Sequence, residues 1–392
     1  MKNEVYLLGA VRSPIGVFCG AFEPVPAPVL GSAMVKAALK RAAVPPDQID
    51  EVIFGNVVSA GLGQNVARQV AIGSGLGASV GATSVNKVCG SGLKAVMLAA
   101  QAVQCGDASI VIAGGTENMS RAPYLLEKAR GGYRMGNGEL VDAMIRDGLW
   151  DIYKNVHMGL CGDRCAEKYN FSREQQDDFA IRSFKRALEA TQKGLFAREI
   201  EPVQVKAGKE MVTVSEDENP KKFNEEKLRK LRPAFGEKGS VTAGNASSIN
   251  DGAAAVVVAS AEKVKQLGLK PQARILGYAS YAREPEWFTL APIGAMEKVL
   301  SRLSLKPNQV DLFEINEAFS VVPMAAMKDL HLPDDRVNVY GGAVALGHPI
   351  GASGARTLVT LLNALKERGG RIGMNSLCIG GGEAVAMVVE LC

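Results

Sequence analysis

The chain has 392 residues, of which 47% are hydrophobic, so it is neither disordered nor of low complexity. Its 45 lysines and arginines nearly balance 41 acidic residues, which argues against a dedicated nucleic-acid-binding protein. Seven cysteines are too few, and odd in number, for a disulfide scaffold. The sequence has neither a secretory signal pattern nor a run of about 18 apolar residues. We therefore expect a cytoplasmic protein without nucleic-acid or membrane partners.

Short β-rich runs alternate with amphipathic helices along the first part of the chain. We expect strands at Val5–Leu8, Val52–Phe54 and Ser109–Ala113, and helices at Gly31–Ala42 and Leu93–Gln104. Such alternation predicts an α/β fold in which helices pack over a largely buried sheet.

The last third of the chain repeats this design. Pro46–Asp50 and Pro307–Asp311 each precede a strand and lie 261 residues apart, and helix-opening glycine segments begin at Gly90 and Gly351 with the same offset. Two matches at one offset predict an internal duplication of roughly 120 residues. Equivalent helix N-termini should then lie close together about a pseudo-twofold axis.

The duplication divides the chain into three parts. We expect residues 1–120, completed by about 245–270, to form the first half, and residues 271–392 to form the second. Residues 121–244 should form an inserted segment that covers the core, with charge-rich helices such as Arg173–Leu195. A basic run at 221–232 within it is either a solvated face or a rim that attracts an anionic ligand.

Cys89 marks the first candidate site. It follows a short apolar strand and precedes the helix-opening sequence Gly90-Ser91-Gly92. A cysteine at a helix start lies near the positive end of the helix dipole, which favours the nucleophilic thiolate. The glycines leave backbone N–H groups free to bind an oxyanion. The pattern predicts either a nucleophile or a buried structural cysteine.

His348 marks the second candidate site. It is one of three histidines and lies in a glycine-rich loop, where Pro349 restricts it to an extended conformation before a helix that begins near Ser353. The 261-residue offset makes Cys89 equivalent to position 350, two residues from His348. The duplication thus predicts that a thiol and an imidazole face each other, the minimal activated nucleophile. The alternative is a hydrogen-bonded core histidine.

Two more candidates follow strands of the second half. Cys378 comes after the strand Ile372–Ser376, where a second thiol would either shuttle a proton or simply fill the core. Asn316 comes after the strand Leu312–Ile315, where its amide would hold a water molecule or donate to an oxyanion.

Six motifs run in order over essentially the whole chain. They are Asn86–Gly92, Gly114–Ser120, Gly244–Ser247, Asn316–Phe319, Gly341–Arg356 and Cys378–Gly382. With these motifs the sequence closely resembles the thiolase family, and within it the biosynthetic acetyl-CoA acetyltransferases. A lone glycine-rich loop would be weak evidence, whereas six ordered motifs that contain four reactive residues are specific.

The resemblance implies a fold and a set of roles. The fold would be two βαβαβαββ halves that form a five-layered α-β-α-β-α core, with an inserted loop domain. By family likeness Cys89 accepts the acyl group, His348 activates it, and Cys378 moves a proton at the α-carbon of the second acyl-CoA. Asn316 would hold a water that binds the thioester oxygen together with His348. The backbone N–H groups of Cys89 and Gly380 would form the oxyanion site.

The resemblance also implies the residues that contact coenzyme A, which is part of substrate and product; we expect no separate cofactor and no metal. These residues are Leu149, His157, Met158, Lys221, Phe235, Ala243, Ser247, Ala318 and Phe319. Many relatives carry an arginine in the adenine-side segment, where this chain reads Asn219-Pro220-Lys221-Lys222. Lysine keeps the charge and loses the planar stacking surface.

The segment 122–138 predicts an assembly. It carries an apolar set among glycines and arginines, formed by Tyr124, Leu125, Leu126, Tyr133 and Met135. Exposed apolar clusters often mark interfaces, and thiolases commonly form dimers of dimers through such a loop. We therefore expect a homotetramer.

Several alternatives stay open. His157, Cys161 and Cys165 repeat at helical spacing, but structural zinc usually needs a fourth ligand, which no neighbour supplies. A decarboxylating ketoacyl synthase would need a second catalytic histidine, either His157 or His331. A broader-range 3-ketoacyl-CoA thiolase would share every motif. A non-catalytic acyl-CoA-binding or lipid-binding relative would be expected to lack one of the two reactive thiols, and this chain has both.

Overall fold

The structure is a computed structural model that describes residues 4–392. Its first half contains, in chain order, β1 (Val5–Arg12), α1 (Ala27–Ala42), β3 (Glu51–Gly55), α2 (Val66–Gly73), β4 (Gly81–Val85), α3 (Ser91–Cys105), β5 (Ile110–Asn118) and, after a long insertion, β12 (Asn250–Ser260). The strands lie side by side in the order β4-β3-β5-β12-β1, and the short β2 (Gly16–Val17) pairs with β12.

The second half repeats the same succession. It contains β13 (Ala273–Ala282), α8 (Ala291–Leu303), β14 (Leu312–Ile315), α9 (Val321–Asp329), α11 (Ser353–Arg368), β15 (Ile372–Ile379) and β16 (Glu383–Leu391). Its strands lie in the order β14-β15-β16-β13. A parallel bridge between Phe313 and Val337 occupies the place that β4 has in the first half. The short helices α7 (Ala261–Gln266) and α10 (Ala343–Leu346) lie in connections.

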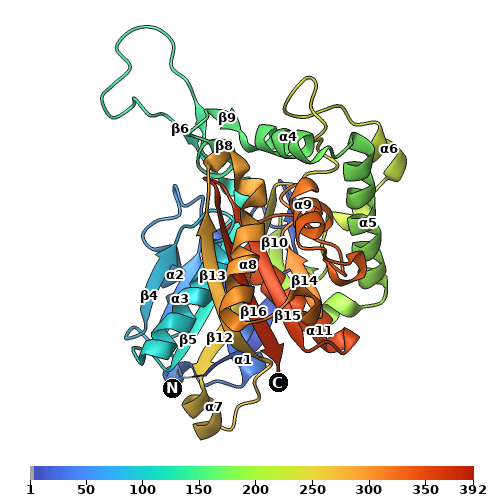
Figure 1. The fold of residues 1–392 in the computed structure, drawn as a ribbon. Coiled ribbons are helices and arrows are strands. Elements are labelled where there is room, and N and C mark those ends of the chain that lie inside the picture. Colours follow the sequence, from blue (N-terminus) through green and yellow to red (C-terminus); the bar gives the residue numbers. More distant parts are fainter. Residues whose placement is uncertain (1–3) are drawn as a thin grey trace.

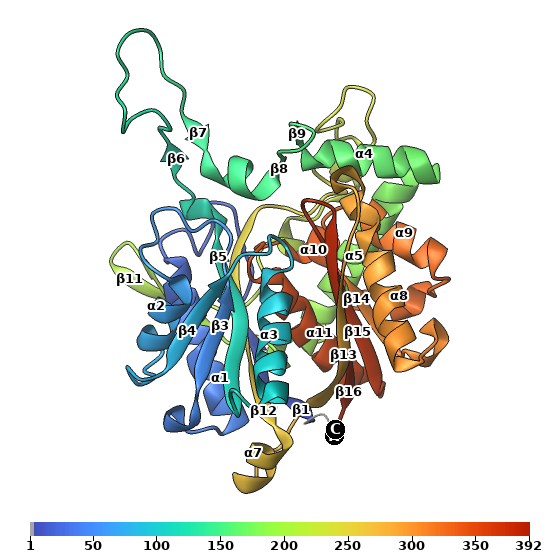
Figure 2. The same cartoon turned by 60° about the vertical axis from the view of Figure 1, so that its left-hand side comes forward.

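The two halves join at one edge and form five layers. β1 pairs with β13 at Tyr6–Arg274 and Leu7–Ala273, so the strands make one continuous ten-stranded sheet. The helices α3 and α11 pack against each other between the two halves of this sheet. Figure 2 shows α1 and α2 outside the first half and α8 and α9 outside the second. The prediction of an α/β fold with duplicated halves and a five-layered core is confirmed.

The sequence explains why this core is closed on both faces. β5 and β12 read as nearly continuous apolar runs and are buried along almost their whole length, as expected for strands with helices on both sides. The segment Val88–Cys105, which contains α3, is long and apolar enough to cross a membrane, but 61% of it is buried inside the protein. This segment is therefore a core helix, one of the two in the central layer.

Equivalent hydrogen bonds show the duplication directly. Asp50 accepts from the backbone N–H groups of Ser109 and Ile110 at 2.6 and 2.9 Å. Asp311 accepts from those of Arg371 and Ile372, both at 2.8 Å. Each carboxylate thus ties the start of one strand to the start of its neighbour.

The helix starts α3 and α11 contact each other reciprocally. A Cβ on Gly92 would lie 2.8 Å from the N atom of Ala355, and a Cβ on Gly354 would meet Leu93. This reciprocal contact makes Gly92 equivalent to Gly354 and Leu93 equivalent to Ala355, each 262 residues apart, so one residue is added between β14 and α11. The expected equivalence of Cys89 with position 350 is therefore wrong by one, and Cys89 corresponds to Gly351.

The insertion between β5 and β12 covers one end of the sheet (Figure 1). Its elements are β6 (Tyr124–Leu125), β7 (Val141–Asp142), β8 (Trp150–Asp151), β9 (Val156–His157), α4 (Met158–Tyr169), α5 (Arg173–Gln192), β10 (Val203–Ala207), β11 (Glu210–Val214) and α6 (Glu225–Arg229). The loop between β6 and β7 projects away from the body. The fully buried Arg12 anchors the insertion by ion pairs to Glu199 and Asp217 at 2.6 and 2.7 Å.

Candidate active site

Cys89 lies in a sharp turn between β4 and α3. Val88, just before it, has a φ of 44°, a left-handed conformation that β-branched residues rarely adopt. Ser91 closes the turn, because its Oγ donates to the carbonyl oxygen of Val88 at 2.7 Å and accepts from the N–H of Lys87 at 2.8 Å. Backbone strain of this kind persists only where the surroundings enforce it, and it is common at functional sites.

The Cys89 thiol is buried, and burial raises its pKa to about 11. The backbone N–H groups of Gly380 and of Cys89 itself point at the sulfur and oppose this rise, while the charge of Glu117 adds to it. Desolvation outweighs these two hydrogen bonds, so the sulfur stays protonated in the protein alone. The thiol needs a base.

His348 is the nearby imidazole, and its environment selects one tautomer. The Oγ of Ser353 donates to the carbonyl oxygen of Pro349 at 2.9 Å, so we assign the 2.6 Å contact with Nδ1 of His348 as a bond donated by Nδ1–H. Burial, followed by the charge of Arg356, lowers the pKa of His348 to about 3. The ring is therefore neutral, with Nε2 unprotonated and able to accept a proton.

Asn316 and Cys378 lie beside this pair. The Nδ2 of Asn316 is 3.5 Å from the Nε2 of His348, at the long limit of a hydrogen bond. Cys378 is fully buried, and burial followed by the proximity of Cys89 raises its pKa well above the usual value. All four reactive residues predicted from the sequence thus converge at one place.

A cavity of about 300 Å³ leads to these groups, and both Cys89 and His348 line it. Of the nine residues expected to contact coenzyme A, eight also line it: Leu149, His157, Met158, Phe235, Ala243, Ser247, Ala318 and Phe319. The ring of His157 stacks on Phe235 with centroids 4.4 Å apart, and Phe319 meets Phe235 edge to face. The walls are mostly apolar, as in sites that hold an extended organic ligand.

Lys221 is the one residue expected to contact coenzyme A that does not line the cavity. Its ammonium group pairs with Glu216 at 2.7 Å. The neighbouring Lys222 instead lines a second hollow of about 180 Å³ together with Lys227 and the stacked rings of Phe184 and Phe223. Gly244, which lines this hollow, directly follows Ala243, which lines the main cavity, so consecutive residues of the chain form part of both walls.

Several residues around the site were not predicted as contacts. The cavity is also lined by Met119, Gly148, Ala234, Ala246, Ser248, Ile249 and Ile350. Met119, Ala246 and Ile350 fall inside the recognised motifs, which was a usable signal, whereas the others fall outside any motif. Asn250 was also missed, and its Oδ1 accepts the backbone N–H of His348 at 3.0 Å.

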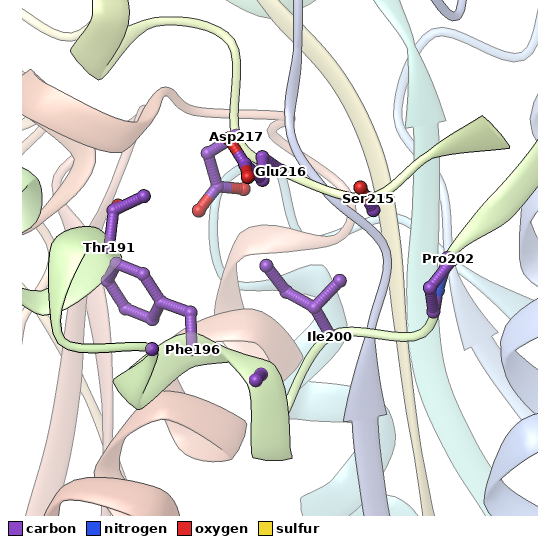
Figure 3. A pocket seen from close by; sticks show the side chains of 9 residues that line it. Thr191, Phe196, Ile200, Pro202, Ser215, Glu216 and Asp217 are labelled. Carbon is purple, nitrogen blue, oxygen red and sulfur yellow. The ribbon is translucent and has the colours of Figure 1, made fainter.

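Two other features of the structure carry no comparable chemistry. A separate cavity of about 280 Å³ is lined by Phe196, Ile200 and Asp217 (Figure 3), and Asp217 is paired with Arg12. Within residues 4–392, no group of three metal-ligating side chains comes together. His157, the first residue of the zinc alternative, instead accepts from the N–H of Gly159 at the start of α4.

Comparison with known proteins identifies close relatives. The chain is 53% identical to acetyl-CoA acetyltransferase 2 of Arabidopsis thaliana, over 99% of this chain and 97% of the relative. It is 50% identical to the acetyl-CoA acetyltransferase of Schizosaccharomyces pombe, over 100% and 99%. These alignments cover both halves and the insertion.

Solved structures and family models agree with these relatives. A thiolase from Ascaris suum in complex with coenzyme A has a TM-score of 0.95 and 46% identity, over 99% of this chain and all of that one. The acetyl-CoA acetyltransferase of Bacillus anthracis has a TM-score of 0.98 and 41% identity, over 100% and 99%. Residues 5–262 match the thiolase N-terminal domain and residues 269–391 the thiolase C-terminal domain. The chain belongs to the thiolase family.

Proposed function

We propose that the protein is an acetyl-CoA C-acetyltransferase. It would catalyse the reversible condensation of two acetyl-CoA molecules to acetoacetyl-CoA and CoA, through an acetyl group carried on Cys89. The observation that carries this proposal is the convergence of Cys89, His348, Cys378 and Asn316 at the end of one apolar cavity. Relatives at about half sequence identity are named for this activity.

The first half-reaction transfers acetyl to Cys89. As the sulfur attacks the thioester carbonyl, its proton moves to Nε2 of His348, which is free to accept it. Negative charge develops on the carbonyl oxygen, where the N–H groups of Cys89 and Gly380 stabilise it; both already point at this sulfur. The CoA sulfur leaves and takes the proton of Cys378, which becomes a thiolate.

The second half-reaction forms the carbon–carbon bond. The Cys378 thiolate removes a proton from the α-carbon of a second acetyl-CoA. The enolate oxygen is stabilised by protonated His348 and by a water held by Asn316, whose Oδ1 is buried and unpaired within residues 4–392. The carbanion attacks the acetyl group on Cys89. Cys89 leaves as a thiolate and recovers its proton from His348, so every group returns to its starting state.

Coenzyme A itself would be bound in two parts. Its pantetheine arm lies in the apolar cavity past Phe235, Phe319 and Ser247. Its nucleotide end reaches the adjoining hollow, where Lys222 and Lys227 supply positive charge for the phosphates. No separate cofactor is required for this chemistry.

One observation favours a broader-range 3-ketoacyl-CoA thiolase as the second candidate. A further cavity of about 430 Å³ adjoins the catalytic one, and Gly148 and Met158 line both. A longer acyl chain would need this space. Thiolysis rates over a chain-length series of 3-ketoacyl-CoAs separate the two: a sharp fall beyond acetoacetyl-CoA supports the narrow enzyme, and a flat profile supports the broad one.

The two remaining alternatives have less support. A ketoacyl synthase would need a second histidine at the reactive sulfur, but His157 stacks in the wall of the cavity, and His331 lies after α9, away from the cavity lining. A non-catalytic binder would release no CoA, whereas the enzyme gives a burst of free CoA from acetyl-CoA alone.

The protein is also proposed to act as a homotetramer in the cytoplasm. Support for the assembly comes from β6 and the projecting loop that follows it, which together expose Tyr124, Leu126, Tyr133 and Met135. Support for the compartment comes from a relative in Gibberella zeae that is 50% identical and named cytosolic.

Peptide mass spectrometry tests the proposed nucleophile. After incubation with acetyl-CoA, the added acetyl group is expected on the peptide that contains Cys89, and Cys89→Ala is expected to abolish both the label and transfer. Acetyl found only on another cysteine would contradict the mechanism.

A further inference from the structure

The ends of β5 and β15 occupy equivalent places in the two halves, and each contacts the catalytic turn of the other half. With the 262-residue offset, Glu117 at the end of β5 corresponds to Ile379 at the end of β15. Ile379 packs against Gly90, beside Cys89, so closely that a side chain at Gly90 would collide with it. Glu117 contacts Gly351, three residues after His348. The contact of Ile379 is apolar, whereas that of Glu117 is a hydrogen bond accepted from a backbone N–H group.

Glu117 joins the two halves through four hydrogen bonds. Its carboxylate accepts from the backbone N–H groups of Val57 and Val58 at 3.0 and 3.2 Å and from the Nδ2 of Asn56 at 2.8 Å, all in the first half. It accepts from the N–H of Gly351, in the second half, at 2.9 Å. The side chain is fully buried and does not line the substrate cavity.

The carbonyl group of the same Gly351 is enclosed by glycines of the first half. A Cβ on Gly55 would lie 2.7 Å from this oxygen and one on Gly92 would lie 3.1 Å from it, while one on Gly115 would collide with it. The first half therefore fixes Gly351 from both sides, its N–H through Glu117 and its carbonyl through close backbone packing.

We propose that Glu117 is a positioning residue, whose carboxylate holds the His348 loop in register with the turn that carries Cys89. The path is short, since Pro349 and Ile350 alone separate His348 from Gly351, and proline restricts the backbone between them. This inference rests on the proposed function, because it concerns the transfer of a proton from Cys89 to His348.

The four donors explain why a carboxylate is required here. All four partners donate, and an ionised carboxylate accepts at both oxygens. Glutamine has nearly the same shape, but its NH₂ group must face N–H groups on one side. Either Val57 and Gly351 or Asn56 and Val58 would then lose their acceptor, and a buried unpaired donor is costly.

The variant Glu117→Gln tests the proposal, assayed at about pH 8, above the pKa of about 7 to which burial raises this carboxyl. Its kcat is expected to fall about 10²-fold, the effect of a small misplacement of catalytic groups. Its KM should stay near the wild-type value, because Glu117 lies outside the cavity. The matched control is Asp50→Asn, which alters a carboxylate that also accepts two backbone N–H groups, at the opposite end of β5. The control should keep the wild-type kcat.

A double-mutant cycle with Gly351→Ala separates positioning from a general loss of stability. A Cβ on Gly351 would lie 2.6 Å from the Oε2 of Glu117, so this variant disturbs the same contact from the other side. If both act through that contact, the double variant loses no more kcat than the worse single variant. Gly351→Ala combined with Asp50→Asn should show only the loss of Gly351→Ala.

The outcomes are distinct from those that test the proposed function. A wild-type kcat in Glu117→Gln, a rise in KM that accounts for the whole loss, or losses that multiply in the double variant would each overturn the positioning role. If Glu117→Gln does not fold, a wild-type kcat in Gly351→Ala overturns it instead. A wild-type protein that forms no acetoacetyl-CoA would refute the proposed function.

Discussion

Nδ1 of His348 lies 2.6 Å from the Oγ of Ser353, and that hydroxyl also donates to the carbonyl oxygen of Pro349 at 2.9 Å. A hydroxyl has one proton, so the bond to Pro349 leaves Ser353 as the acceptor for Nδ1–H. The protein thereby directs the basic Nε2 towards Asn316 and the cavity. A side chain outside the cavity lining sets which nitrogen of the imidazole takes up the proton.

Replacing this hydroxyl should lower the rate of acetyl transfer. Ser353→Ala frees His348 to rotate and to change tautomer, and we expect kcat to fall about 10- to 100-fold, the cost seen when the partner that orients a metal-bound histidine is removed. Steady-state assays give kcat and KM. Thr357→Val is the control, because it removes a hydroxyl that donates to the backbone of Ser353 one turn along the helix. An unchanged kcat in Ser353→Ala would show that packing alone orients the ring.

The pH dependence of stability should reveal the buried imidazole. The pKa of His348 is about 3 in the folded protein, against 6.5 for an ordinary histidine, because burial disfavours the charged ring. As the pH falls from 6.5 towards 3, only the unfolded chain takes up this proton, so the folded state loses stability. Above pH 6.5 the ring is neutral in the folded and the unfolded state, so this loss of stability is absent.

The shifted pKa values of other buried groups affect stability in the opposite direction, so the measurement compares the wild type with a variant. Burial raises the pKa of Glu117 to about 7 and that of Asp251 to about 6, and both therefore favour the folded state as the pH falls. We would measure the thermal midpoints of the wild type and of His348→Asn across this pH range. The contributions of Glu117 and Asp251 are common to both proteins and cancel in the difference between the two midpoints. The advantage of the wild type over the variant should shrink on acidification, and a difference independent of pH would contradict a neutral buried ring.

The duplication predicted that Cys89 and His348 lie close together, because each precedes one of two equivalent helices. Asn316 and Cys378 lie at strand ends, and the resemblance to thiolases, not the duplication, predicted that they join this pair. The one-residue error in the repeat arose in the connection between β14 and α11, where an added residue leaves no periodic signal.

The features that sequence reasoning missed depend on burial and on side-chain direction. The high pKa of Cys89 comes from desolvation, which a helix start does not reveal. Glu117 lies at the end of an apolar strand, and nothing local indicates that four donors converge on it. Lys221 and Lys222 are adjacent and chemically alike, and only the backbone turn determines which one faces the hollow.

These two lysines allow a matched test of the nucleotide site. Lys222→Ala should raise the KM for acetyl-CoA about 5- to 10-fold, which corresponds to roughly 1 kcal/mol for one exposed phosphate contact. A short acetyl thioester of cysteamine, which lacks the nucleotide, should show no such change. Lys221→Ala should leave both values unchanged, because its partner is Glu216. If Lys221→Ala has the larger effect, the nucleotide lies on the other side of this turn.

The projecting loop provides the test of assembly. Met135 in this loop is 93% exposed, in a segment that also exposes Tyr124, Leu126 and Tyr133. Such a surface is expected to be covered by other copies of the chain. Met135→Asp would place a charge inside that interface at a cost of about 2 kcal/mol or more, so we expect the tetramer to dissociate into dimers. Light scattering at micromolar concentration measures the mass of the assembly.

Met211→Asp, which changes an exposed methionine on the β10–β11 hairpin, is the control and should keep the wild-type mass. A monomeric wild type, or a Met135→Asp variant that stays tetrameric, would show that this loop does not hold the assembly together.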